Sequence, residues 1–334
     1  MLRKMDFCKS DEFPQERVFL KILWVIFLVY MMIPLAFANG YPDRPIKFVA
    51  AATAGSPADI LARAVAEGMS KELKVPIVVE NKPGADQIIG FEHVARGAPN
   101  DGYTVGIVGI DGQALLPLTK KQMRFDPRTD LTIVAGLGEG RYMLAGPASL
   151  GVKNFQELMD EIKAHPKKFD FGTSGPVVLI PMLTLMNRLQ LEMNHIPYKG
   201  GGPYSQDLAA GNIHLGFLSE TSARPLANRL RFFGVTGESR SPFEPNVPTF
   251  AELGFPQVFG PAYALVVRAG TPKSVIDRLA AAASVALASP EMKARSQGLL
   301  LSIRYSSPEE ASKTLRERIQ SYTEIAQRVG LHPE

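Results

Sequence analysis

Two short loops of small and hydroxyl-bearing residues could bind an anion through main-chain N–H groups. The first, residues 53–56 (TAGS), follows an apolar run and precedes a helical pattern that begins at Pro57. The second, residues 172–176 (GTSGP), precedes another helical pattern. Free N–H groups and the positive end of the helix dipole converge at a helix N-terminus. Each loop could therefore hold a carboxylate without a basic side chain, although an ordinary strand-to-helix turn has the same pattern.

The sequence carries none of the common signatures of nucleophilic, phosphate-binding or metal-dependent chemistry. It has no G-x-S-x-G, P-loop or H-E-x-x-H, and its five histidines show no ligand spacing. Residues 136–140 (GLGEG) resemble a dinucleotide-binding loop, but Arg141 stands where the next glycine should be. No motif ties a histidine or an acid to Ser174, which we interpret as a loop hydroxyl donor. We therefore expect no catalysis, no metal and no cofactor.

Strands and helices alternate along the chain in two series, separated near residue 131. Alternation with short connections predicts doubly wound, mostly parallel sheets, whose ligands lie at the carboxyl ends of the strands. Strands are predicted over residues 46–52, 76–80, 103–110, 131–137, 142–146, 169–173, 195–198, 213–219, 230–236 and 263–268. Helices are predicted over residues 57–69, 87–96, 179–189, 205–210, 272–288 and 308–328, and from residues 154 and 221 onward. Residues 110–113 (IDGQ) are interpreted as a loop at a strand end.

The two series and the late return strand predict an α/β fold of two lobes, each a sheet with flanking helices. Lobe 1 is expected to comprise residues 41–141 and 262–334, and lobe 2 residues 142–261. The chain would then cross between the lobes twice, and two crossings make a hinge.

The composition is that of a soluble globular protein. Of the chain's residues, 46% are hydrophobic and 21% are charged. Its length of 334 residues is enough for two domains. The formal charge of +4 is spread along the chain without a basic run. We therefore expect no binding to nucleic acid.

Residues 22–38 predict a signal peptide. They are almost entirely apolar, follow Lys21, and end in Ala-Phe-Ala, the small-x-small pattern of signal-peptidase cleavage. We place the cut after Ala38, which implies a periplasmic protein; a transmembrane anchor is the alternative. The only cysteine, Cys8, would be removed with this segment, so the mature chain would lack disulfides and thiol chemistry.

Five phrases of the sequence point together to one family. They are YPDRPIKFVAAATAGSPADILAR at 41–63, VVENKPGADQIIG at 78–90, PNDGYT at 99–104, IPYKGGGPYSQDLAAG at 196–211 and VPTFAELGFP at 247–256. From Tyr41 to its end the chain resembles the periplasmic substrate-binding receptors of tripartite tricarboxylate transporters, the Bug-type or TctC-like receptors. The resemblance implies two lobes that close on a small carboxylate, no cofactor and no catalysis. It also implies the transporter's membrane components as partners of a monomeric receptor.

In that family two loops, one from each lobe, grip the carboxylate. Carried onto this sequence, they are residues 53–59 and 173–178, and Asp59 either buttresses the first loop or accepts a polar ligand group. Three features depart from the family: Ala52 replaces an aromatic residue, Ser56 replaces a glycine, and residues 176–180 (PVVLI) are apolar. An apolar or aromatic acid is therefore favoured over citrate-like polyanions, unless residues 177–180 are simply helix core.

Further candidates come from predicted strand ends and from the crossing between lobes. Asp111 and Glu220 could recognise an amino or amide group, or could be solvated carboxylates at the rim, and Arg141 could supply a second charge. The predicted ligand-binding residues are Ala52, Thr53, Ala54, Gly55, Ser56, Asp59, Asp111, Gly112, Gln113, Arg141, Thr173, Ser174, Gly175, Pro176, Val177, Val178, Tyr198, Asp207, Glu220 and Tyr263.

The preferred function is thus a transport receptor for a small organic carboxylate. The alternative is a receptor-derived sensory partner, or a periplasmic enzyme, that acts on a similar carboxylate. The absence of an activated nucleophile, metal site or cofactor fingerprint weighs against the enzyme.

Overall fold

The computed structural model describes residues 40–333. The predicted signal segment, its cleavage position after Ala38, and Cys8 lie outside these residues. No helix within the described part combines the length and the apolar character that crossing a bilayer requires.

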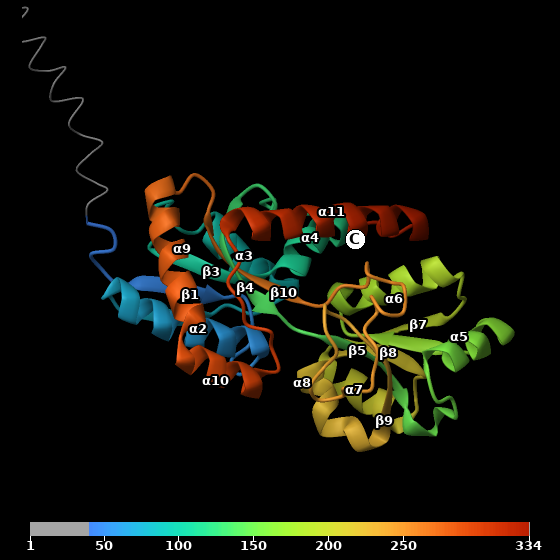
Figure 1. Cartoon of the computed structure of the whole chain (residues 1–334). Helices are drawn as coiled ribbons and strands as arrows, with labels where there is room; N and C mark the ends of the chain where they lie inside the picture. Colours follow the sequence, from blue (N-terminus) through green and yellow to red (C-terminus); the bar gives the residue numbers. More distant parts are fainter. Residues whose placement is uncertain (1–39, 334) are drawn as a thin grey trace, which may run out of the picture. The chain divides into compact units, whose positions relative to one another are not determined.

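Two five-stranded sheets carry the fold (Figure 1). The sheet of lobe 1 has the order β2 (Ile77–Asn81), β1 (Ile46–Ala50), β3 (Thr104–Gly109), β10 (Ala262–Arg268), β4 (Leu131–Glu139). The sheet of lobe 2 has the order β7 (Asn194–Pro197), β6 (Asp170–Thr173), β8 (Leu215–Ser219), β5 (Tyr142–Pro147), β9 (Leu230–Val235). All ten predicted strands are therefore present. Most are short apolar runs between turn residues, which mark inner strands well, whereas β7 is an exposed edge strand.

In each sheet four strands run in one direction and one strand is reversed. In lobe 1 the strand β10 is antiparallel to both β3 and β4, and in lobe 2 the strand β5 is antiparallel to both β8 and β9. The sheets, which we predicted to be mostly parallel, are thus mixed: one strand in each is antiparallel to both of its neighbours. The reversed strands are the two that receive the chain from the other sheet, which explains why a simple βαβ progression did not predict them.

Helices cover the sheets and connect their strands. They are α2 (Pro57–Leu73), α3 (Ile88–Ala95), α4 (Ile110–Thr119), α5 (Phe155–Ala164), α6 (Pro176–Leu189), α7 (Gly201–Ala210), α8 (Glu220–Ala223), α9 (Lys273–Ala288), α10 (Pro290–Leu299) and α11 (Pro308–Val329). The capping box expected at the start of α11 is present, with the Ser307 side chain and Glu310 bonded reciprocally. Asn154 caps α5 through the N–H group of Glu157, as its spacing predicted.

The interpretation of residues 110–113 as a loop is wrong, because they form the first turn of α4. Every residue from Ile110 to Leu116 is buried, so this helix is enclosed on all sides. An enclosed helix has no polar face and therefore lacks the 3.6-residue periodicity by which helices are recognised in a sequence. The helix α10 was also not predicted.

Helix α6 of lobe 2 packs against α4 and α11 of lobe 1. Ile180, which is 1% exposed, belongs to a hydrophobic cluster that includes Leu115 of α4 and Tyr322 of α11. Val177 packs against this cluster and also against the core of lobe 2. The first two turns of α6 therefore form part of the contact between the lobes.

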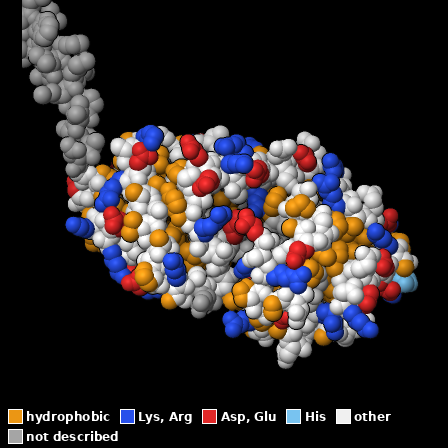
Figure 2. All heavy atoms as spheres, viewed as in Figure 1, with side chains coloured by type: hydrophobic (Ala, Val, Ile, Leu, Met, Phe, Trp, Pro, Cys, Tyr) orange, Lys and Arg blue, Asp and Glu red, His pale blue; other side chains and the backbone are white. Residues whose placement is uncertain are grey.

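Charged side chains of both signs are interspersed over the face of the molecule seen in Figure 2. Among the described residues many charged side chains are paired, as in Lys82 with Glu80 at 2.6 Å and Arg295 with Glu67 at 2.7 Å. No continuous area of one sign stands out on this face.

Candidate ligand-binding site

The first predicted loop is held in shape by a buried carboxylate. Asp59 is 3% exposed and accepts hydrogen bonds from the Gly55 N–H group at 2.8 Å and from the Asn81 side-chain amide at 2.8 Å. Arg63 completes the set with a contact of 3.0 Å. Burial alone would raise the pKa of Asp59, but these hydrogen bonds and the Arg63 charge outweigh burial and lower it below its ordinary value. Asp59 thus acts as a buttress of the loop.

The residues of this loop that precede Asp59 are open to solvent. Thr53, Ala54 and Gly55 are exposed, and Gly55 has a φ of 79°, a left-handed conformation that glycine adopts without strain. Asn81 also donates to the Ala52 carbonyl at 3.1 Å, so one amide fixes the beginning of the loop and its buttress together.

The second predicted loop lies at an uncapped helix N-terminus. Gly175 precedes α6 with a φ of 151°, and no side chain caps the helix. A Cβ built on Gly175 would have no neighbour within 4 Å, so the space before the helix is open. Neither this loop nor the first contains Lys or Arg. An anion here would therefore be stabilised by main-chain N–H groups and the helix dipole.

Strand β7 fixes the start of this second loop. The Thr173 hydroxyl lies 2.7 Å from His195 Nε2, and the Thr173 carbonyl accepts from the Tyr198 N–H group at 2.8 Å. His195 stacks on Phe171 with ring centroids 4.9 Å apart, and burial lowers its pKa. Sequence reasoning did not find His195 as a positioning residue. The parallel register that sets it beside Phe171 cannot be read from spacing along the chain.

The apolar residues that follow the second loop lie mainly in the core. Val178 and Ile180 are 7% and 1% exposed and belong to hydrophobic clusters. They are therefore helix core, which was the alternative to a role in contacting the ligand. Val177 and Leu179 are only partly buried and stay closer to the surface.

Asp111 and Glu220 are not solvated carboxylates at a rim, since they are 4% and 2% exposed. Asp111 accepts from the Ala262 N–H group at 3.0 Å and from the Tyr322 hydroxyl. Glu220 accepts from the Ser241 hydroxyl. Both acids therefore join distant segments of the chain, and their role in recognising a ligand stays a prediction.

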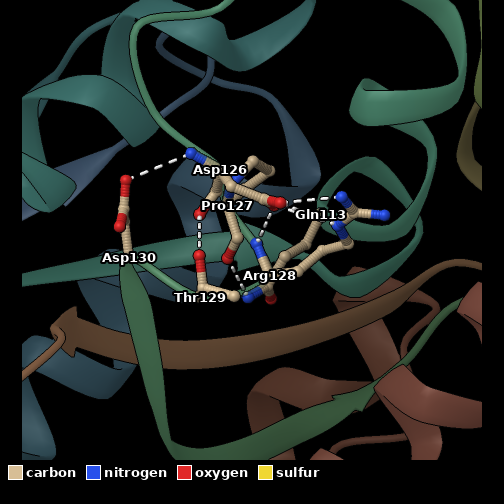
Figure 3. A network of polar contacts seen from close by, with 6 residues as sticks. All are labelled: Gln113, Asp126, Pro127, Arg128, Thr129 and Asp130. Atoms are coloured by element: carbon tan, nitrogen blue, oxygen red, sulfur yellow. Dashed lines mark hydrogen bonds and ion pairs between the residues drawn. The ribbon is translucent and has the colours of Figure 1, made fainter.

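Gln113 is fully buried and points to the loop that precedes β4. Its side-chain amide donates to the Pro127 carbonyl at 2.7 Å, beside the ion pair of Arg128 and Asp126 at 2.7 Å (Figure 3). The hydrogen bond from the Arg128 side chain lowers the pKa of Asp126. Gln113 thus anchors a surface turn, and among residues 40–333 its side chain makes no hydrogen bond to either loop.

Arg141 lies at the crossing between β4 and β5, where we expected a charge. Its guanidinium is 3.7 Å from Glu220 and 3.3 Å from the Ser239 hydroxyl. Together with Tyr263, Glu139 and other residues it lines a cavity of about 90 Å³. Burial and the nearby Asp111 raise the pKa of Tyr263 to about 12. Residues of the two predicted loops do not line this cavity.

Tyr198 and Asp207, both predicted as ligand-binding residues, bind each other. The Tyr198 hydroxyl donates to Asp207 at 2.8 Å, and Asn212 donates to the other carboxylate oxygen at 3.0 Å. Burial and the hydrogen bond to Asp207 raise the pKa of Tyr198 to about 12. Within residues 40–333 no hydrogen bond joins the first loop to the second.

The stretch from Gly84 to Gln87, which leads into the predicted helix and belongs to one of the family phrases, has an unusual backbone. Gly84, Ala85, Asp86 and Gln87 all have positive φ, at 118°, 46°, 53° and 79°. Gln87 begins α3 without a side-chain cap on that helix.

Taken together, the two sheets, the two crossing segments and the open loops at strand ends define a two-lobed α/β binding protein. Within this class, the chain belongs to the tripartite tricarboxylate transporter family receptors, whose family model matches residues 61–331. The family resemblance expected from the five sequence phrases is thereby confirmed.

Three similar proteins illustrate the relationship. The UPF0065 protein in the gbd 5′ region of Cupriavidus necator is 32% identical over 299 residues, which cover 88% of this chain and 90% of the relative. A structure described as a periplasmic transporter has 32% identity and a TM-score of 0.75, covering 87% of this chain and 99% of that one. Rpa4515 of R. palustris, whose structure contains adipate, has 26% identity and a TM-score of 0.75, covering 88% of this chain and all (100%) of that one.

Proposed function

We propose that the protein is an extracytoplasmic solute-binding receptor that captures a small organic carboxylate between its two lobes. It delivers this ligand to the membrane components of a tripartite tricarboxylate-type transporter. The observation that carries the proposal is the uncapped N-terminus of α6 behind Gly175, with the hydroxyls of Thr173 and Ser174 in the same loop. The adipate bound to Rpa4515 supports a carboxylate as the ligand class.

Export supports the same role. Removal of the apolar segment after Ala38 would release a chain that begins just before the first family phrase, at Tyr41. We take residues 41–141 and 262–334 as lobe 1 and residues 142–261 as lobe 2, because β4 and β5 lie in different sheets and β10 returns to the first.

The ligand is expected to be a monoacid or diacid and not a citrate-like polyanion. Neither loop supplies a basic side chain that could balance three charges, and Arg141 is already 3.7 Å from Glu220. Ala52 and Val177 are the residues that would meet an apolar part of the ligand. Val178 and Ile180 do not contribute, because they are buried in the cores.

A thermal-shift screen tests the proposal. Succinate, adipate, hexanoate, benzoate and citrate are added to the mature chain at increasing concentration. A ligand at 100 times its Kd adds about 2.7 kcal/mol to the free energy of unfolding, which raises Tm visibly. Stabilisation by citrate alone would contradict the ligand class, and no stabilisation by any of the five would contradict the function.

Variants of the second loop separate main-chain binding from binding by Arg141. Ser174→Ala should weaken carboxylate binding by about 1.5–3 kcal/mol, the value of a hydrogen bond to a charged group. Gly175→Val should cost more, because φ is 151° there. Ser149→Ala, an exposed hydroxyl elsewhere in lobe 2, is the control. If calorimetry shows that only Arg141→Ala abolishes binding, the two-loop account is wrong.

A further inference from the structure

An ionisable side chain, His195, lies directly against the second loop. It belongs to β7, the edge strand beside β6, and its Nε2 atom is 2.7 Å from the Thr173 hydroxyl. The parallel register pairs His195 with Phe171, and the two rings stack with centroids 4.9 Å apart and planes inclined by 18°. Among residues 40–333, no other ionisable side chain forms a hydrogen bond with a side chain of residues 173–178.

The hydrogen bond between His195 and Thr173 can run in either direction. A hydroxyl has a single hydrogen to donate, and a neutral imidazole has one nitrogen that donates and one that accepts. If Nε2 accepts, the Thr173 hydrogen is used on the imidazole and cannot reach an anion. If Nε2 donates, the hydroxyl hydrogen is free for an anion at the loop. Protonated His195 allows only the second arrangement, because both of its nitrogens are donors.

The charged groups near His195 do not compete with the loop for its proton. Burial lowers the pKa of His195, and no neighbouring charge contributes to that shift. On β6, Asp170 accepts from the Asn194 amide at 2.9 Å and lies 3.6 Å from His214. Helix α6 has no ionisable residue before Arg188 in its last turn. The charge that would change the protonation of His195 must therefore come from a ligand.

The second loop offers an anion no permanent positive side chain. Neither Lys nor Arg occurs in residues 173–178, so main-chain N–H groups and the α6 dipole would provide the attraction. A carboxylate beside the Thr173 hydroxyl would favour the charged form of His195, because opposite charges at close range stabilise each other. Carboxylate binding and protonation of His195 would therefore promote each other.

We propose that His195 makes ligand capture by the second loop proton-linked. Its protonated imidazole donates to Thr173, which turns the hydroxyl hydrogen toward the carboxylate, and the bound anion in turn holds the proton on His195. His195 is a positioning residue, because it acts on the ligand through Thr173. This inference rests on the function proposed above and adds a regulation of the same site: affinity for an organic carboxylate rises as pH falls.

The sign of the pH dependence follows from linkage. Binding raises the pKa of His195 above its value in the ligand-free receptor, which burial places below the ordinary value of 6.5. Affinity is therefore constant above the pKa of the bound state, increases as pH falls through it, and levels off below the pKa of the free state. A rise of half a unit to one unit corresponds to roughly threefold to tenfold tighter binding across this window.

Calorimetry with adipate in two buffers of different ionisation enthalpy measures the protons taken up on binding, between about pH 5 and 8, where histidine titrates. The parent should take up a fraction of a proton that His195→Gln does not, because glutamine can donate to Thr173 but does not titrate. The titration of adipate itself is common to both proteins and cancels. His165→Gln, which replaces an exposed histidine after α5, is the matched control and should match the parent.

Two variants of Thr173 test whether its hydroxyl is the link. Thr173→Val removes the hydroxyl and leaves the His195 ring on Phe171, so it should weaken adipate binding and abolish the extra proton uptake. Thr173→Ser keeps the hydroxyl and should retain the uptake. Nuclear magnetic resonance of the imidazoles gives a separate readout: adipate should raise the pKa of His195 and leave that of His165 unchanged.

The possible results separate this inference from the receptor function. If adipate, or the acid of the screen that raises Tm most, binds the parent and His195→Gln with equal proton uptake, the role of His195 is overturned while the receptor function stands. Parent-like uptake in Thr173→Val overturns it as well, and this variant decides if thermal denaturation shows that His195→Gln is unfolded. If none of the five acids binds, the receptor function fails and the role of His195 falls with it.

Discussion

Asp59 shows how a buried, charged residue can support a binding loop without touching the ligand. The helix start predicted at Pro57 is capped by Ser56, whose hydroxyl accepts from the Asp59 N–H group at 3.4 Å. The contact with Asn81, 22 residues further along, could not be predicted from spacing. The loop's exposed N–H groups thus depend on a carboxylate that faces inward.

Asp59→Asn should lower the free energy of unfolding at neutral pH by about 1–3 kcal/mol, because a buried acceptor and its charge pairing with Arg63 are lost. The folded-state pKa of Asp59 is lowered, so the unfolded state binds more protons and stability rises with pH. The contribution is complete above the ordinary aspartate pKa of about 3.9 and is lost as pH falls through the folded pKa.

Urea unfolding of parent and variant between pH 3 and pH 7 is the measurement. Asp277→Asn, which removes an exposed carboxylate paired with Lys273, is the control and should change stability little. A difference between parent and Asp59→Asn that stays constant down to pH 3 would contradict the role of the charge.

At the scale of elements, the first turns of α6 have two roles. Its uncapped beginning faces the second loop, while Ile180 packs against lobe 1. Sequence alone left open whether residues 177–180 contact a ligand or belong to the core. The structure divides them: Val178 and Ile180 are buried, whereas Val177 and Leu179 are only partly buried.

Ile180→Ala and Val177→Ala should therefore have opposite signatures. Ile180→Ala leaves a cavity between α6 and lobe 1 and should cost about 2–5 kcal/mol of stability. Val177→Ala should change stability less and should weaken binding of hexanoate or adipate. Chemical denaturation and calorimetry on both variants measure this. Equal losses of stability with unchanged binding would show that Val177 is core as well.

Most strands were predictable from the sequence because they are apolar runs between turn residues; β7, an exposed strand at the sheet edge, is the exception. Helix α4 was not, since burial on all sides removes the periodic signal. The burial of Asp111 was also hidden: its partners Ala262 and Tyr322 are 151 and 211 residues away in the chain. The two loops were predictable as strand-to-helix connections, whereas the contact of His195 with Thr173 depends on a strand register that only the folded backbone sets.

At the scale of the whole molecule, the lobes are joined by short crossing segments that bind each other. The Gly140 N–H group donates to the Pro261 carbonyl at 2.7 Å, so the two crossings lie together. Glu139 and Ser302 exchange two main-chain hydrogen bonds, at 3.0 and 2.8 Å, beside the first crossing. Relative movement of the lobes would therefore occur about one narrow region.

Ligand binding should bring the lobes together, because each loop offers only part of the hydrogen bonds that a carboxylate accepts. Small-angle scattering should show a smaller radius of gyration with saturating adipate, or with whichever acid in the screen raises Tm most. Gly175→Val, which should not bind, is the control and should show no change. An unchanged radius for the parent at saturation would contradict closure.

The reversed strand β10 also constrains the order in which the protein can be assembled. It lies between β3 and β4, yet it comes from a part of the chain that follows all strands of lobe 2. The sheet of lobe 2 is continuous in sequence from Tyr142 to Val235. During synthesis or export, that sheet has every strand before lobe 1 does. Until residues 262–268 arrive, β3 and β4 are two unpaired edges, the kind of surface on which incomplete chains associate with one another.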